Sequence, residues 1–296
     1  MKNNSDNDSL NFVSEFKPSG VIMLDGLRQK DIREDKTGIK IFNQLRDMNE
    51  FGSEKKIFCS RDVVETVDAL RDRLNALADE LPADFAYILH LECHGGDDFI
   101  EIGDGREQMT WREFMKLLAP LNLRNECNVG LVLACCNGFG SFKVDDLAEP
   151  VPFYFQLSHS GVIYSNVLEE SLTEFYRKIL TEQDLHGAVS AAAPFKMKYA
   201  EEMFANLIYR VMHSESRKKS YETDVNTILS GVLSKGGIGG NMDISFNRKL
   251  VKDHVGTFEK QIADRIRSHM GFFSGRKPGF TLEQLVAWVA GGKTLK

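Results

Sequence analysis

Two residues of this 296-residue chain carry the side chains of a nucleophile and a base, and each follows a predicted strand. His94 comes just after the apolar run Phe85–Leu91, and Cys135 directly follows the apolar run Val129–Ala134. In an open parallel sheet, catalytic groups gather at the carboxyl ends of the strands, and neighbouring strands lie about 4.8 Å apart. A thiol beside an imidazole forms a nucleophile–base pair, because the thiolate is the attacking species.

Small residues follow both side chains. Gly95 removes side-chain bulk where a substrate carbonyl would approach His94. The turn-forming segment 137–140 after the cysteines leaves backbone N–H groups free to point at an oxyanion. Together these residues indicate acyl transfer.

The elements that must position these residues alternate between strands and helices, over about residues 19–211. Apolar periodicity predicts helices that include residues 37–51, 63–81, 110–118, 168–179 and 188–211, the last kinked or divided by Pro194. Predicted strands are Val21–Leu24, Lys56–Cys59, Phe85–Leu91, Val129–Ala134 and Val151–Leu157, and residues 99–105 predict a small hairpin. This order predicts an α/β fold with a mostly parallel sheet between helices. His90, inside the third strand, is predicted to be a core residue, and capping boxes are predicted at Thr110 with Glu113 and at Thr281 with Gln284.

The chain on either side of this region differs in character. Residues 1–18 are polar at their start and predict a short disordered leader without the features of a secretory signal. Residues 212–296 predict a mostly helical extension, with helices over 255–269 and 281–289 and a Gly-rich break at 236–240. The extension is basic, with 14 Lys and Arg against 8 Asp and Glu (+6), whereas residues 1–211 hold 23 against 35 (−12). We interpret it as a solvated helical surface, since no aromatic–basic signature of RNA binding accompanies the charge.

Composition excludes several classes of protein. The apolar runs are far shorter than the roughly 20 residues of a membrane-spanning helix. Five cysteines form an odd set without repeated spacing, which favours a reducing compartment over a disulfide framework. We therefore expect a cytoplasmic protein with no membrane contact and no direct binding of nucleic acid.

With these residues in place, the sequence resembles a family. The segments YILHLECHGG and VGLVLACCNG resemble the His-Gly and Ala-Cys-x-x-Gly blocks of caspase-like cysteine peptidases, especially the bacterial CHAT group. The segments FIEIGDGREQMTWREFMKLL and VPFYFQLSHSGVIYSNVLEESLTEFYRKIL resemble the hairpin and helix, and the fifth strand and long helix, of those domains. The resemblance covers about residues 19–205 and implies a caspase-like three-layer sandwich.

The resemblance also implies roles for individual residues. His94 would be the general base and Cys135 the nucleophile that forms the acyl-enzyme, while Gly95 and Cys135 would donate backbone N–H groups to the oxyanion. Such peptidases need no metal or organic cofactor. A pocket near the ends of the first and fifth strands would select the residue cleaved after, and those ends offer Asp25, Arg28, Gln156, Ser158, His159 and Ser160.

These residues leave the specificity open. Asp25 would select Lys or Arg, Arg28 would select an acidic residue, and Gln156 with Ser158 would suit an uncharged one. The partners expected are a protein substrate and a regulatory or sensor protein, in a bacterial stress or defence pathway.

Adjacent cysteines complicate the choice of nucleophile. Consecutive side chains of an extended chain point to opposite sides, so only one of Cys135 and Cys136 can face His94. Alignment with the family's Ala-Cys favours Cys135. A zinc site built from Cys93, His94, Cys135 and Cys136 is the lesser alternative, because the chain has no C-x-x-C or H-x-x-x-H spacing. A further alternative is a caspase-like module that binds a partner protein without catalysis, since a fold does not certify an activity.

Overall fold

The computed structural model describes residues 10, 12, 15–52, 56–141, 150–213, 258–273 and 276–291. The described chain divides into two compact units. The first, here called the sheet unit, is Val13–Ala200 with Gly271–Lys277. The second, here called the helical unit, is Met1–Phe12 with Glu201–Met270 and Pro278–Lys296.

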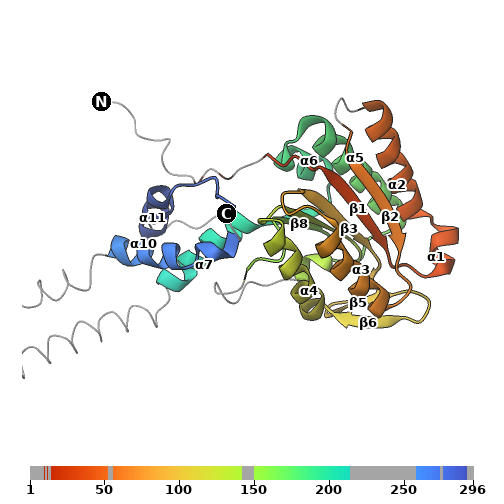
Figure 1. Ribbon diagram of the computed structural model, residues 1–296, viewed down its shortest axis with the longest axis horizontal. Coiled ribbons are helices and arrows are strands. Elements are labelled where there is room, and N and C mark those ends of the chain that lie inside the picture. Colours follow the sequence, from red (N-terminus) through yellow and green to blue (C-terminus); the bar gives the residue numbers. More distant parts are fainter. Residues whose placement is uncertain are drawn as a thin grey trace, which may run out of the picture. The chain divides into compact units, whose positions relative to one another are not determined.

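The sheet unit is built on a six-stranded sheet with the order β2-β1-β3-β7-β8-β9 (Figure 1). Its strands are β1 (Gly20–Asp25), β2 (Phe58–Val63), β3 (Tyr87–Glu92), β7 (Val129–Ala134), β8 (Phe155–Ser158) and β9 (Lys196–Tyr199). All neighbours are parallel except β8 and β9. Every residue of β1, β3, β7 and β8 is buried, as expected for strands covered on both faces. The predicted α/β fold with a mostly parallel sheet is confirmed.

Helices flank this sheet. They are α1 (Gln29–Glu34), α2 (Thr37–Asp47), α3 (Val67–Glu80), α4 (Trp111–Arg124), α5 (Ser165–Glu182) and α6 (Leu185–Ala191), with a π-helical turn η1 (Met48–Gly52) and a 3₁₀ turn η2 (Gly138–Gly140). The helices α3 and α4 pack together, as do α2 and α5 (Figure 1).

The predicted capping box of Thr110 and Glu113 opens α4. His90, predicted to be a core residue, is fully buried in β3 and its Nδ1 lies 2.7 Å from Tyr176 Oη in α5.

A second, small sheet follows β3. It joins β4 (His94–Gly95), β5 (Phe99–Ile102) and β6 (Glu107–Thr110) in antiparallel order, with the predicted hairpin formed by β5 and β6. The chain therefore leaves the large sheet at Cys93 and enters the small sheet at His94 without an intervening loop.

One predicted helix is wrong in part. Residues 188–211 do not form a single helical stretch, because the strand β9 separates α6 from α7 (Ala200–His213). The strand pairs antiparallel with β8 at the edge of the sheet, and the predicted division of this region at Pro194 is confirmed. Pairing with β8 overrides the local helical pattern of the sequence.

The sheet unit also begins and ends outside the predicted range 19–211. Phe16 is buried and stacks on Tyr154, with 5.8 Å between the ring centroids, although it falls in the predicted leader. At the other end, the guanidinium of Arg276 lies over the Tyr154 ring, 3.5 Å from its centroid, and the Val151 N–H donates to Phe272 O at 3.2 Å. Residues 271–277 are thus part of this unit rather than of a separate extension.

The helical unit contains most of α7, together with α10 (Phe258–Ser268) and α11 (Leu282–Ala290), and the 3₁₀ turn η3 (Met270–Phe273) starts at its boundary. The capping box of Thr281 and Gln284 opens α11 as predicted. Tyr209 packs on Trp288, and His213 Nε2 lies 2.8 Å from Val289 O, which joins α7 to α11. The predicted Gly-rich break at 236–240, and most of the basic balance of residues 212–296, lie outside the described residues.

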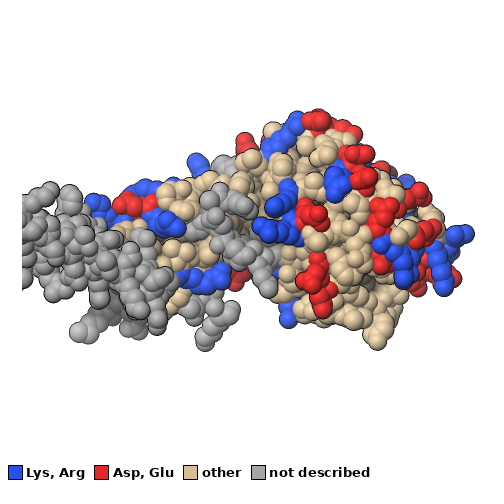
Figure 2. All heavy atoms as spheres, turned by 90° about the horizontal axis from the view of Figure 1, so that it is seen from below, with Lys and Arg blue, Asp and Glu red and all other residues tan. Residues whose placement is uncertain are grey.

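On the face of the sheet unit drawn in Figure 2, Lys and Arg side chains lie among Asp and Glu side chains. The described helices include none that is both long and apolar enough to cross a membrane.

Candidate active site

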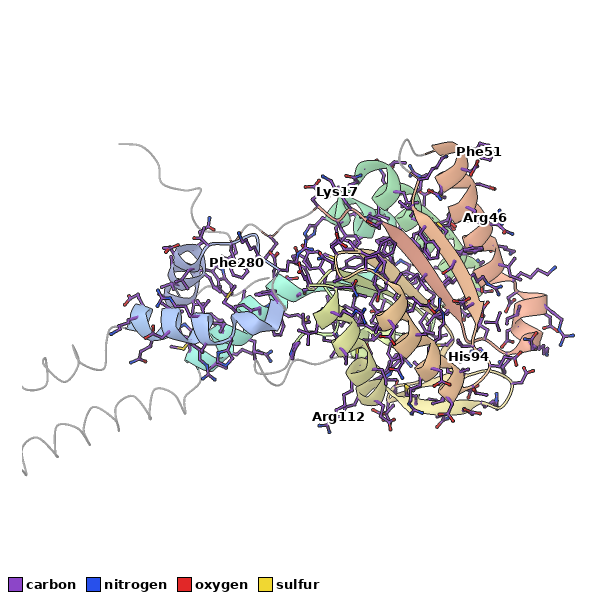
Figure 3. The ribbon with its side chains drawn as sticks, in the orientation of Figure 1. Lys17, Arg46, Phe51, His94, Arg112 and Phe280 are labelled. Atoms are coloured by element: carbon purple, nitrogen blue, oxygen red, sulfur yellow. The ribbon has the colours of Figure 1, made fainter. Side chains whose placement is uncertain are left out.

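His94 and Cys135 lie at the same edge of the large sheet. They follow β3 and β7, which are adjacent and parallel, with Glu92 opposite Ala134 in the last pair of the register. Figure 3 shows His94 at this edge, where β3 leads towards the β5–β6 hairpin. Among the described residues no hydrogen bond joins His94 to a cysteine, so the two predicted catalytic side chains share an edge without a direct bond.

Gly95 brings the two strand exits into contact. A Cβ added at Gly95 would lie 2.0 Å from the carbonyl oxygen of Cys136 and 3.3 Å from Cys135 Cβ. The nearest obstacle is backbone, so a side chain at this position would push the two strand ends apart. In the sequence, Gly95 was interpreted as leaving room for a substrate carbonyl. The close approach of the two backbones is a second reason for a glycine at this position.

The Gly95 N–H points away from β5. In an antiparallel pair, hydrogen-bonded and non-hydrogen-bonded residue pairs alternate. The Gly96 N–H donates to Phe99 O at 2.8 Å, so the preceding N–H faces away from β5. Donation to an oxyanion by Gly95 and Cys135 stays a prediction.

Cys135 is enclosed by the protein, with 2% of its surface exposed. Its thiol lies beside that of Cys93, and interaction with Cys135 together with burial raises the pKa of the Cys93 thiol well above its ordinary value. Gly138 closes the other side, since a Cβ there would lie 3.3 Å from Cys135 Sγ. A thiol without access to solvent is poorly placed to meet a substrate.

Cys136 differs from Cys135 in being partly exposed, and it contacts another part of the chain. The Ile163 N–H, in the loop before α5, donates to Cys136 Sγ at 3.5 Å. The adjacent thiols therefore have different neighbours, as the alternation of side chains predicts.

Extrapolation of the strand register matches one of these thiols with His94. The β3–β7 pairing ends at Glu92 and Ala134. Continued by one residue it would place Cys93 opposite Cys135, whose thiols interact, and continued by two it would place His94 opposite Cys136. His94 itself pairs with Glu101 of β5, so the match with Cys136 follows from the alternation of side chains beyond the paired residues.

Neighbouring elements agree with this assignment. His94 contacts α1, and Cys136 contacts the loop that leads into α5. The helices α1 and α5 both pack against α2. His94 and Cys136 therefore lie on the α2 side of the strand ends.

A carboxylate that sequence reasoning missed lies against His94. Asp31 Oδ2, in α1, is 2.8 Å from His94 Nε2 and 2.7 Å from Arg28 Nε. Burial alone would raise the pKa of Asp31, but the hydrogen bonds from His94 and Arg28 prevail and hold it below its ordinary value. Asp31 has Asp35 and Glu34 as close sequence neighbours, and no spacing in the sequence distinguished it from them.

Asp25, predicted to line a specificity pocket, has its partners inside the protein. It is 1% exposed and forms an ion pair with Arg61 of β2. Beside it, Thr37 donates to the buried carboxyl of Glu92, and burial raises the pKa of Glu92 to about 8. Arg28 is partly exposed and engages Asp31, as described above. A contact of Asp25 or Arg28 with a substrate stays a prediction.

The residues predicted at the end of the fifth strand support the loop after the cysteines. Gln156 and Ser158 are buried, and Gln156 Nε2 donates to Gly138 O and to Ser158 Oγ, at 2.9 Å each. The Phe139 N–H donates to the carbonyl of His159 at 2.9 Å. Ser160 is exposed. Their contact with a substrate also stays a prediction.

The described residues contain no group of three or more His, Cys, Asp and Glu placed to hold a metal ion, so the zinc alternative gains no support from them. Cys59, Cys93, Cys135 and Cys136 are free thiols. No protein-family model and no curated protein matches this chain, so the resemblance to CHAT peptidases rests on its own residues.

Proposed function

We propose that this protein is a cysteine endopeptidase that hydrolyses a peptide bond in a protein substrate through a Cys–His pair and an acyl-enzyme. The observation that carries the proposal is the contact of two strand exits, His94-Gly95 and Cys135-Cys136, at the carboxyl edge of adjacent parallel strands. A sheet of this kind, covered by helices, is also compatible with the caspase-like sandwich that the sequence predicts.

The chemistry follows from these groups. The thiol gives its proton to His94, and the thiolate adds to the substrate carbonyl to form a C–S bond. The Gly95 N–H and the N–H of the attacking cysteine stabilise the oxyanion. The C–N bond then breaks, the amine leaves with the proton from His94, and water assisted by His94 hydrolyses the thioester.

Of the two thiols, we propose Cys136 as the nucleophile in place of Cys135, which the sequence pattern favoured. Extrapolation of the β3–β7 register places Cys136 opposite His94, and Cys136 is partly exposed, whereas Cys135 is buried beside Cys93. The role in regulation, the protein substrate and the sensor partner remain part of the proposal, as does the location in the cytoplasm.

Labelling with a peptide electrophile tests the function. Purified protein is incubated with a library of peptidyl acyloxymethyl ketones, and covalent adducts are detected as an increase in intact mass. We expect an adduct that depends on the peptide sequence and is lost in His94→Ala. A chain that reacts with iodoacetamide but with no peptidyl electrophile would support the non-catalytic binding module instead.

A further inference from the structure

The contact between Asp31 and His94 defines which ring nitrogen can act as the base. A carboxylate only accepts hydrogen bonds, so the nitrogen 2.8 Å from Asp31 Oδ2, which is Nε2, carries the hydrogen. In the neutral ring the lone pair is then on Nδ1. This is the nitrogen that remains to take a proton from a thiol.

Arg28 fixes the carboxylate in turn. Its Nε donates to the same Oδ2 at 2.7 Å, from the residue that precedes α1, so one oxygen receives hydrogen bonds from both Arg28 and His94. The first residue of α1 is itself tied to the small sheet, because the Gln29 N–H donates to Asp104 Oδ1 at 2.8 Å. Asp31 is therefore held from two sides.

Hydrophobic packing does not account for the position of α1. This six-residue helix contains no buried residue, so it contributes little to the hydrophobic core. Its interactions are polar, and the most sequestered of its ion pairs converge on Asp31, whose side chain is 17% exposed. The helix follows β1 directly and lies at the carboxyl edge of the sheet, where His94 also lies.

We propose that Asp31 is a positioning residue for the peptidase reaction: supported by Arg28, it holds His94 as the Nε2–H tautomer, orients the ring so that Nδ1 meets the thiol, and stabilises the imidazolium formed during attack. The inference rests on the proposed function. It adds a residue that the Cys–His pair alone does not require.

Kinetics of Asp31→Asn test the inference once a peptide substrate has been identified. The amide keeps the size of the side chain but removes the charge, and its NH₂ group can favour the wrong tautomer. We expect kcat to fall by up to about 10⁴-fold with little change in KM, which is the loss seen when an amide replaces a carboxylate that orients a catalytic imidazole. The acidic limb of kcat/KM should move to lower pH, because a ring that has lost its counter-charge takes up the inactivating proton only at lower pH. Asp31→Glu should recover part of kcat.

Glu34→Gln is the matched control, because Glu34 lies on the same helix and its ion-pair partner, Lys30, is 3.9 Å away on an exposed surface. Its kcat and pH profile should equal those of the unaltered protein. An unaltered kcat and pH profile in Asp31→Asn would overturn the inference, whereas the proposed function would stand as long as His94→Ala is inactive.

A measurement on the unaltered chain covers the case in which Asp31→Asn does not fold. The protein is labelled with ¹⁵N at histidine, and the side-chain ¹⁵N shifts of His94 are measured at a pH at which its ring is neutral. These shifts report directly which ring nitrogen carries the hydrogen. The Nε2–H form is expected, and the Nδ1–H form would overturn the inference whatever the activity. Failure of the peptidyl electrophile to label the unaltered chain would instead count against the proposed function.

Discussion

Cys93 and Cys135 interact through their thiols just past the ends of β3 and β7, and this interaction raises the pKa of Cys93 well above its ordinary value. Cys135, which the Ala-Cys pattern had marked as the nucleophile, is therefore engaged with another buried thiol.

The first prediction separates the two adjacent cysteines. Cys136→Ala should abolish peptide hydrolysis, because the thiol paired with His94 is lost. Cys135→Ala should keep the reaction and lower the free energy of unfolding by about 1 kcal/mol, through lost packing. Peptide mapping after reaction with a peptidyl electrophile identifies the modified cysteine. An adduct on Cys135, with activity surviving in Cys136→Ala, would restore the sequence prediction and leave the peptidase proposal intact.

The second prediction concerns the contact between the strand exits. Gly95→Ala should reduce kcat/KM by at least about 100-fold, because its Cβ would meet the Cys136 carbonyl at 2.0 Å and separate the His94 and Cys136 backbones. Gly271→Ala is the control, since an added Cβ there meets nothing within 4 Å. Equal activity of the two variants would show that the close approach has no role in the reaction.

The third prediction is a dependence of stability on pH that arises from two buried groups. Burial raises the pKa of Glu92 from 4.5 to about 8 and lowers the pKa of His90 from 6.5 to about 3. Folded Glu92 keeps a proton that the unfolded chain releases, so stability falls as pH rises from about 4.5 to about 8. Folded His90 rejects a proton that the unfolded chain binds, so stability also falls as pH drops from about 6.5 to about 3.

The two slopes oppose each other between pH 4.5 and pH 6.5, where the free energy of unfolding should be nearly constant. Urea denaturation from pH 4 to pH 9 measures this profile. Glu92→Gln should remove most of the alkaline decline, while Glu170→Gln, at an exposed position of α5, should leave the profile unchanged. A decline that persists in Glu92→Gln would assign it to other groups.

The fourth prediction concerns Asp25, which the sequence placed at the mouth of a specificity pocket. Because it is buried and paired with Arg61, Asp25→Ala should lower the free energy of unfolding by about 3–5 kcal/mol. The control is Asp62→Ala, which removes a more exposed partner of Arg73 and should cost about 1 kcal/mol or less. If Asp25→Ala is as stable as the control and loses only cleavage after Lys or Arg, Asp25 acts on the substrate after all.

The elements that could be predicted are those whose pattern is local. A few neighbouring residues are enough to predict the strand Val129–Ala134 and the capping boxes at Thr110 and Thr281. Each of these forms as predicted. The strand β9 could not be read in the same way, because Lys196–Tyr199 extends only through pairing with β8.

At the candidate site, the sequence predicted which residue types lie at the strand ends, but it did not predict the directions of their side chains. His94 and Cys135 were predicted at strand ends, and they lie there. Which cysteine points to the His94 side depends on the register between β3 and β7, a relation between distant segments. The same holds for Asp31, which reaches His94 only because α1 lies at the edge where β3 ends.

Residues 271–277 give the sheet unit a particular order of assembly during synthesis. Phe272 and Arg276 complete its packing against Val151 and Tyr154, yet the ribosome makes them only after residues 201–270, which belong to the other unit. At about 5–20 residues per second, several seconds separate the emergence of Ala200 from that of Lys277. The unit that carries His94 and Cys136 is thus finished only after residues 201–270 of the helical unit have been made.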